Sequence, residues 1–148
     1  ALIRRFHEAV ENNIPNVTCW GSGNSYREFL HVDDLGEACV SMLEKWNPSS
    51  KNSPKDKEGK TLSHLNVGTG KDIRISDLAN LIAEELNYNG RIIWDKKKID
   101  GTPKKLLDVS RINKLGWYSK ISLREGIKMT INSFKSELQN NLIKSNRY

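Results

Sequence analysis

Short runs with the pattern of β-strands alternate along this chain with amphipathic helical segments, and this alternation constrains the fold more than any other feature. A β-like run at residues 16–20 ends in the glycine-rich turn of residues 21–25. Before it, apolar residues recur at helical spacing over residues 2–10. They are Leu2, Ile3, Phe6, Ala9 and Val10. Strands that alternate with helices predict an α/β fold.

The alternation continues along the rest of the chain. We expect Asp33 or Asp34, Ser76 and Ser122 to cap helices, because short polar side chains accept hydrogen bonds from the free N–H groups of a first turn. The further predicted elements are an extended piece at 27–32, a helix with apolar residues from 35 to 46, a strand at 62–67, a helix from 76 that stops at 89–90, a strand at 91–95, a short helix at 109–115 and a last helix from 123.

Composition narrows the class of protein. The 148 residues carry 24 Lys and Arg against 18 Asp and Glu, a net charge of +6, and 36% of them are hydrophobic. A chain of this length forms one domain or part of a larger one, and its hydrophobic fraction provides enough apolar residues for a core. No apolar run reaches the roughly 18 residues of a membrane span. Cys19 and Cys39 form no CxxC pair, which favours reduced thiols and a cytoplasmic protein.

One segment, residues 47–60, has no apolar side chains that could pack into a core. Residues 47–60 contain Ser, Asn, Pro, Lys and Gly but no aliphatic or aromatic side chain. Such a segment buries too little surface to offset its ordering entropy. We therefore expect residues 1–148 to form one portion of a protein, with a mobile surface insertion at 47–60 and a polar tail after residue 139.

Motifs for nucleotide and metal chemistry are incomplete. Two glycine turns, at 21–23 and 68–70, suggest a dinucleotide fingerprint, but Tyr26 and Ile73 stand where its third glycine belongs. The chain has no P-loop, and no tyrosine is followed by the lysine of a Tyr-x-x-x-Lys reductase pair. The three histidines lack metal-ligand spacing. We predict no catalytic residue, no cofactor site and no metal site in this chain.

Cations and one indole near predicted turns suggest a different kind of site. Guanidinium groups match phosphate oxygens bidentately, and an indole can stack on a base. The residues are Arg5, Trp20, Arg27, Lys104 and Lys105. Together they resemble the parts of a nucleoside-diphosphate site, although scattered arginines and tryptophans are more often surface charge and core.

Six sequence blocks carry a family resemblance. They are Arg-Arg-Phe-His-Glu-Ala at 4–9, Trp-Gly-Ser-Gly at 20–23, Arg-Glu-Phe-Leu-His-Val-Asp-Asp at 27–34, Leu-Ser-His-Leu-Asn-Val-Gly-Thr-Gly at 62–70, Asp-Gly-Thr-Pro-Lys-Lys-Leu-Leu-Asp-Val at 100–109 and Leu-Gly-Trp-Tyr at 115–118. In this order they resemble the C-terminal, substrate-binding half of the GDP-L-fucose synthase family, which belongs to the extended short-chain dehydrogenases/reductases. Only the insertion and the tail fall outside the resemblance.

The resemblance implies an activity and a site. The family converts GDP-4-keto-6-deoxy-D-mannose to GDP-L-fucose by epimerisation and NADPH-dependent reduction, and its Rossmann and catalytic residues correspond to sequence upstream of Ala1. By motif, Arg5, Trp20, Arg27 and Lys105 match positions that hold GDP, and Asp100 lies in the block that lines the same site. The implied partners are a GDP-sugar, an N-terminal Rossmann half and a second copy in a homodimer, with neither nucleic acid nor membrane.

Other interpretations of the residues stay open. The chain could be the substrate domain of another sugar-nucleotide epimerase or dehydratase, since the blocks at 27–34 and 115–118 are widespread among those enzymes. It could also be a non-catalytic module that binds nucleotides or polyanions through its lysine-rich loop, or those lysines could serve solubility alone. If the chain is the substrate-binding part, it is expected to be inactive alone.

Overall fold

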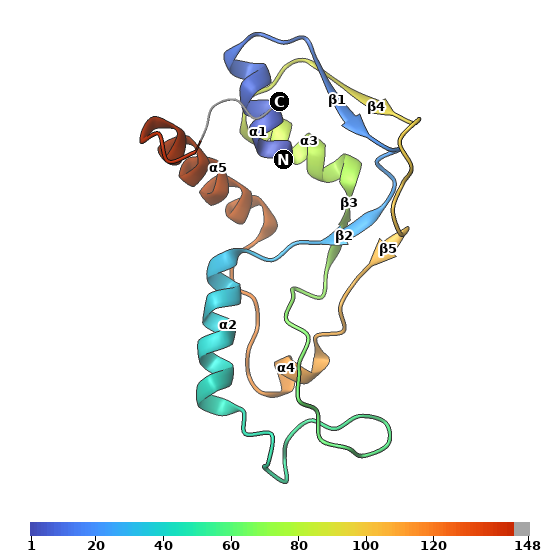
Figure 1. The fold of residues 1–148 in the computed structure, drawn as a ribbon, viewed down its shortest axis with the longest axis vertical. Helices are drawn as coiled ribbons and strands as arrows, with labels where there is room; N and C mark the ends of the chain where they lie inside the picture. Colours follow the sequence, from blue (N-terminus) through green and yellow to red (C-terminus); the bar gives the residue numbers. More distant parts are fainter. Residues whose placement is uncertain (144–148) are drawn as a thin grey trace. The chain divides into compact units, whose positions relative to one another are not determined.

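A computed structural model describes residues 1–143, which divide into two compact units. The first unit comprises residues 1–26, 73–104 and 123–143, and the second comprises residues 27–72 and 105–122. The chain passes between the units within three short strands. These are β2 (Tyr26–Glu28), β3 (Asp72–Arg74) and β5 (Lys104–Lys105), which pair in the order β3-β2-β5 (Figure 1).

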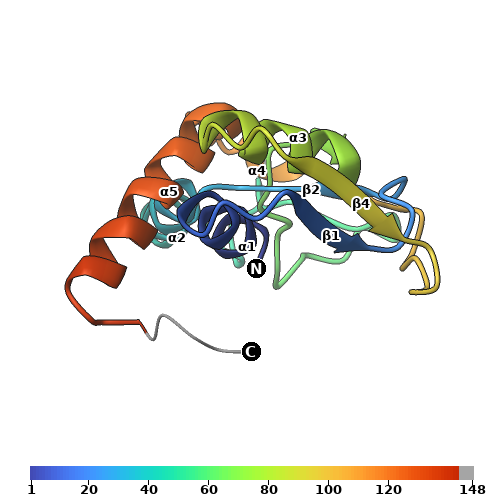
Figure 2. The same ribbon diagram turned by 90° about the horizontal axis from the view of Figure 1, so that it is seen from above.

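A parallel strand pair forms the centre of the first unit. β1 (Asn16–Trp20) pairs in parallel with β4 (Arg91–Asp95), and its residues alternate between buried and exposed. Figure 2 shows α3 (Ile75–Glu85) lying across one face of this pair. The buried positions of β1 are Val17 and Cys19, as a half-buried strand requires. The predicted α/β class and both of these strands are confirmed.

Helices complete the core of the first unit. α1 (Leu2–Glu11) packs against β1 and α3, and α5 (Leu123–Gln139) packs against α3. Phe6 of α1 is fully buried, with its ring 5.4 Å from that of Tyr88 in an edge-on arrangement. The core comprises Phe6, Ala9, Val17, Cys19, Leu78, Ala79, Ile82, Ala83, Leu86, Ile127 and Ile131.

The second unit has a much smaller apolar core. It contains α2 (Val32–Lys45) and α4 (Ser110–Lys114), and its buried apolar cluster is Ala38, Ile112 and Trp117. Asp34 of α2 is only 2% exposed. Its carboxylate accepts hydrogen bonds from the backbone N–H groups of Lys120 and Ile121 at 3.0–3.2 Å. A buried carboxylate thus joins α2 to the loop before residue 123.

Two sequence predictions for the second unit are wrong. Residues 62–67 form no strand, because no neighbouring strand pairs with them, and Val67 packs instead against the small apolar cluster. Neither Asp33 nor Asp34 caps α2. His31 is its N-cap, with Nδ1 accepting from the N–H of Asp33 at 3.3 Å, so the predicted extended piece ends before Val32.

The start of α3 also differs from the prediction. Ser76 lies inside the helix, and its backbone N–H donates to the carbonyl of Gly23 while that of Ile75 donates to the carbonyl of Ser25. Carbonyl oxygens of the 21–25 turn thus satisfy two first-turn N–H groups, which removes the need for a side-chain cap. The helix ends at Glu85 rather than at 89–90, and Asn87 has a φ of 54°.

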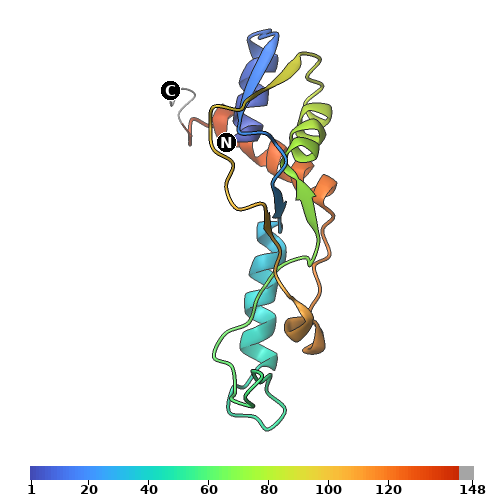
Figure 3. The same cartoon turned by 90° about the vertical axis from the view of Figure 1, so that its right-hand side faces the viewer.

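The predicted insertion forms a loop beyond the C-terminal end of α2 (Figure 3). The side chain of Asp56 accepts from the N–H groups of Glu58 and Lys60, and the indole N–H of Trp46 donates to the hydroxyl of Ser53 at 2.9 Å. Its mobility stays a prediction. α5 ends at Gln139 as expected, and the tail beyond residue 143 lies outside the described residues.

Among residues 1–143, none of the helices has the length and apolar content needed to cross a bilayer. The same residues contain no group of three His, Cys, Asp or Glu side chains arranged to hold a metal ion. Cys19 is a buried free thiol and Cys39 an exposed one.

Candidate functional site

The carboxyl ends of β1 and β4 meet at one edge of the first unit, where Trp20 lies opposite Asp95. In sheets with parallel strands, ligands bind at this edge. Trp20 is 68% exposed here, and the Lys98 ammonium lies 5.4 Å from the centroid of its ring. An exposed indole beside a cation is suited to a ligand that has an aromatic ring and negative charge.

Asp100 joins the two loops that leave these strands. Its Oδ1 accepts from the backbone N–H of Ser22 at 2.8 Å, and its Oδ2 accepts from the Ser22 hydroxyl at 2.5 Å. These bonds to the ionised form hold the pKa of Asp100 below its usual value. Gly21, at φ +81°, leaves room for this contact, because a Cβ there would lie 2.2 Å from Oδ1. Asp100 therefore fixes the loop that carries Lys98.

Arg5 lies against β1. Its Nη1 donates to the carbonyl of Thr18 at 2.6 Å. Burial raises the pKa of the neighbouring Cys19 thiol, and the Arg5 guanidinium opposes that rise. A guanidinium has five N–H donors, so this bond leaves others for a phosphate.

Arg27 and Lys105 belong to the second unit. They lie on β2 and β5, which are neighbours in the three-stranded sheet. Arg27 is half-buried and Lys105 is exposed. Of the five predicted site residues, the structure thus brings Trp20 and Asp100 to one strand edge with Arg5 against β1, and it places the other two on adjacent strands of the second unit.

Three residues that the sequence argument missed support these positions. Ser22 holds Asp100, Lys98 lies over Trp20, and the carboxylate of Glu28 accepts hydrogen bonds from Gly70 and Leu107. Ser22 and Lys98 lie within segments that the sequence had marked as turn and basic loop. Nothing in the spacing around Glu28 indicates that a strand glutamate would bind two distant backbone groups.

The glycine turns do not fit a dinucleotide. A pyrophosphate needs backbone N–H groups that point outward from the turn or from the following helix. Here the first-turn N–H groups of Ile75 and Ser76 donate to the 21–25 turn, and the N–H of Gly70 donates to Glu28 at 2.6 Å. The N–H groups of Gly70, Ile75 and Ser76 therefore donate to other parts of the chain and do not point outward to a ligand.

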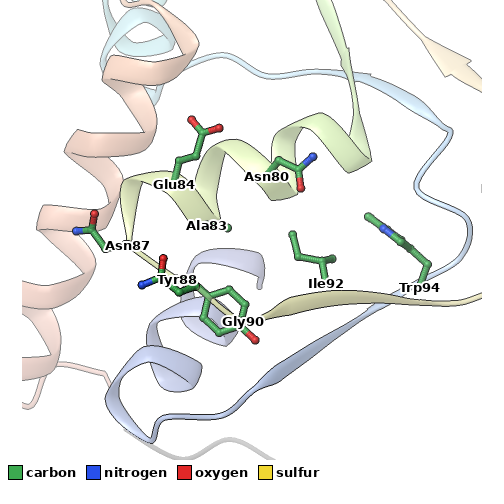
Figure 4. Close-up of a pocket in the computed structure, with 9 residues that line it drawn as sticks. Asn80, Ala83, Glu84, Asn87, Tyr88, Gly90, Ile92 and Trp94 are labelled. Atoms are coloured by element: carbon green, nitrogen blue, oxygen red, sulfur yellow. The ribbon is translucent and has the colours of Figure 1, made fainter.

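A cavity of about 660 Å³ lies between α3 and β4 (Figure 4). Its lining includes Asn80, Glu84, Tyr88 and Trp94, and none of the five predicted site residues. The pKa of Tyr88 is raised by burial. The hydroxyl of Tyr88 donates to the carbonyl of Ile14 at 3.2 Å, so this hydroxyl makes a hydrogen bond within the protein.

Several known proteins are similar to this chain in sequence and in fold. Residues 1–68 match the family model described as the NAD dependent epimerase/dehydratase family. A crystal structure of a GDP-6-OMe-4-keto-L-xylo-heptose reductase from Campylobacter jejuni is similar, with a TM-score of 0.78 and 30% identity over 92% of this chain and 47% of that one. A GDP-mannoheptose C4 reductase from the same organism, with NADP bound, has a TM-score of 0.72 and 32% identity over 90% and 43%. The fold therefore matches part of the fold of the extended short-chain dehydrogenases/reductases, the class to which these reductases belong.

Within that class, the resemblance to GDP-L-fucose synthases is confirmed. The GDP-L-fucose synthase of Escherichia coli strain K12 is 48% identical over 138 residues, which is 90% of this chain and 40% of the relative. The chain thus spans about 40% of the length of this relative.

Proposed function

We propose that this chain is the GDP-sugar-binding part of an NADPH-dependent epimerase/reductase that converts GDP-4-keto-6-deoxy-D-mannose to GDP-L-fucose. The observation that carries the proposal is the 48% identity to a GDP-L-fucose synthase over 90% of the chain. The proposed ligand residues are Arg5, Trp20, Arg27, Asp100 and Lys105. Arg5, Trp20 and Lys105 would bind the base and the phosphates. Arg27 would donate two parallel hydrogen bonds to the diphosphate, and Asp100 would order the loop in which it lies.

The proposal divides the reaction between this chain and other sequence. NADPH supplies a hydride when it is bound, and the groups that bind it and carry out the epimerisation are proposed to lie outside this chain. The whole enzyme is proposed to be a cytoplasmic homodimer with both isomerase and reductase activity. This chain contributes substrate binding and orientation.

The first test is an activity assay. Full-length protein that includes this chain is expected to oxidise NADPH only when GDP-4-keto-6-deoxy-D-mannose is present and to release GDP-L-fucose. The chain alone is expected to oxidise none, because hydride transfer requires a cofactor held against the substrate. Full-length protein that folds but leaves NADPH unchanged with this substrate would contradict the proposed activity.

The second candidate is a different sugar-nucleotide enzyme. The similarity to a UDP-glucose 4-epimerase from Thermotoga maritima, at 26% identity and a TM-score of 0.71, gives this alternative its support. Titration of GDP and UDP into the same preparation separates the two, since we expect binding of GDP and at least about tenfold weaker binding of UDP, the discrimination that one or two lost base hydrogen bonds provide. Tighter binding of UDP would favour the alternative.

A further inference from the structure

The carboxylate of Glu28 joins two segments of the second unit that lie far apart in the sequence. Oε1 accepts from the backbone N–H of Gly70 at 2.6 Å and from the hydroxyl of Thr69 at 3.3 Å. Oε2 accepts from the backbone N–H of Leu107 at 3.0 Å. One side chain therefore binds both the 68–70 turn and the segment that follows β5.

The 68–70 turn is shaped to admit this carboxylate. A Cβ atom at Gly68 would lie 2.4 Å from Oε1 of Glu28. Gly70 has a φ of +70°, and a Cβ there would lie 3.0 Å from a methyl group of Val109. A side chain at Gly68 would displace the Glu28 carboxylate, and one at Gly70 would be strained by the positive φ and press against Val109, so both glycines favour the observed contact.

Glu28 follows the candidate-site residue Arg27 in β2 and lies in the strand next to that of Lys105. Arg27 precedes it in β2, and successive side chains of a strand point to opposite faces. Lys105 lies in the neighbouring strand β5, two residues before Leu107, whose backbone N–H donates to Glu28. The pairing of β2 and β5 places Lys105 beside β2, and the hydrogen bond from Leu107 to Glu28 is a second tie between these strands, two residues beyond Lys105.

We propose that Glu28 is a positioning residue for binding of the diphosphate, an inference that rests on the proposed function. Its oxygens are occupied by N–H and O–H donors, so it acts through Arg27 and Lys105 rather than by contact with the ligand. A bidentate arginine and a neighbouring lysine bind a diphosphate well only when their spacing is held to within about 0.5 Å. The Glu28 carboxylate fixes that spacing together with the pairing of β2 and β5.

The test is titration of GDP into full-length protein by calorimetry. Glu28→Gln keeps one acceptor oxygen but turns an amide N–H₂ toward one of the backbone donors, and Glu28→Ala loses all three hydrogen bonds. We expect the affinity for GDP to fall about tenfold in Glu28→Ala, which corresponds to about 1.4 kcal/mol, the net contribution of one typical hydrogen bond. Glu28→Gln should lie between Glu28→Ala and the wild type.

The matched control is Asp56→Asn, because Asp56 also binds two backbone N–H groups in the second unit but lies in the 47–60 segment. It should leave the affinity for GDP unchanged. In a Lys105→Ala background, the effect of Glu28→Gln should shrink, because the two residues act together.

Three results would overturn the inference. If the folded Glu28 variants bind GDP as tightly as the wild type, Glu28 is only structural and the proposed function stands. If Glu28→Gln does not fold, its role is in folding rather than in positioning. If the wild type binds no GDP, the proposed function fails and this inference fails with it.

Discussion

The two units of the chain differ in the internal contacts that stabilise each of them. The first packs eleven buried apolar residues around a parallel strand pair. The second buries three apolar residues, and it relies on single carboxylates, Asp34 and Glu28, that accept hydrogen bonds from distant backbone N–H groups. Stability of the first unit should therefore respond to lost volume, whereas the second should respond to the loss of individual charged acceptors.

The largest expected effect is a cavity in the first unit. Phe6→Ala removes a fully buried ring that packs against Tyr88. We expect the free energy of unfolding to fall by about 3–5 kcal/mol. Chemical denaturation measures the change, with Tyr118→Ala as a control because that side chain is 60% exposed. A loss no greater than that of the control would contradict an apolar origin of the first unit's stability.

Asp34→Ala tests the second unit. It leaves the backbone N–H groups of Lys120 and Ile121 without their acceptor. Because Lys120 is exposed and Ile121 half-buried, water replaces part of the lost hydrogen bonding, and the total loss should be about 1–3 kcal/mol. We expect a smaller loss of stability than for Phe6→Ala, measured by the same denaturation. Full retention of stability would show that the hydrogen bonds of the Asp34 carboxylate do not stabilise this unit.

The same difference explains how much of the structure could be predicted from the sequence. Periodicity of apolar residues identifies helices and strands that bury a face. It predicted α1, β1, β4 and α5 of the first unit and α2 of the second, although the cap and the end expected for α3 were wrong. In the second unit the strand expected at 62–67 and the caps expected from Asp33 or Asp34 were wrong. There, local patterns cannot show that Asp34 binds residues about 86 positions later in the chain.

The candidate site likewise has a part that the sequence predicted and a part that it could not predict. Motifs predicted its residue types, and Trp20 and Asp100 do lie at one strand edge. The hydrogen bond from Ser22 to Asp100 and the contacts of Glu28 link positions about 78 and 79 residues apart, which no spacing rule connects. The supporting contacts therefore had to come from the structure.

A pH titration probes a polar contact within the first unit. The pKa of Asp100 is lowered by its hydrogen bonds to Ser22, so this contact stabilises the loop fully above the ordinary aspartate pKa and is lost as the pH falls through the lowered value. The NMR shift of the Ser22 N–H should move in that acidic range, and Asp100→Asn should abolish the transition. An unchanged titration in the variant would assign it to another group.

The smallest effect is expected in residues 47–60. Because this segment has no aliphatic or aromatic side chain, its backbone N–H groups should exchange with solvent far faster than those of α3. Hydrogen exchange compares the two directly. Protection of residues 47–60 as strong as that of α3 would show that polar contacts alone, such as that between Trp46 and Ser53, order the segment.

Titration of GDP into wild-type and Arg27→Lys full-length protein by calorimetry tests the proposed diphosphate site most directly. Lysine keeps the charge but lacks the fork, so binding should weaken by about 1–3 kcal/mol, and the difference should shrink as salt is added. Trp20→Ala should weaken binding with little dependence on salt. Equal affinities of the wild type and Arg27→Lys for GDP would make Arg27 a surface charge and contradict the assignment of the diphosphate to this site.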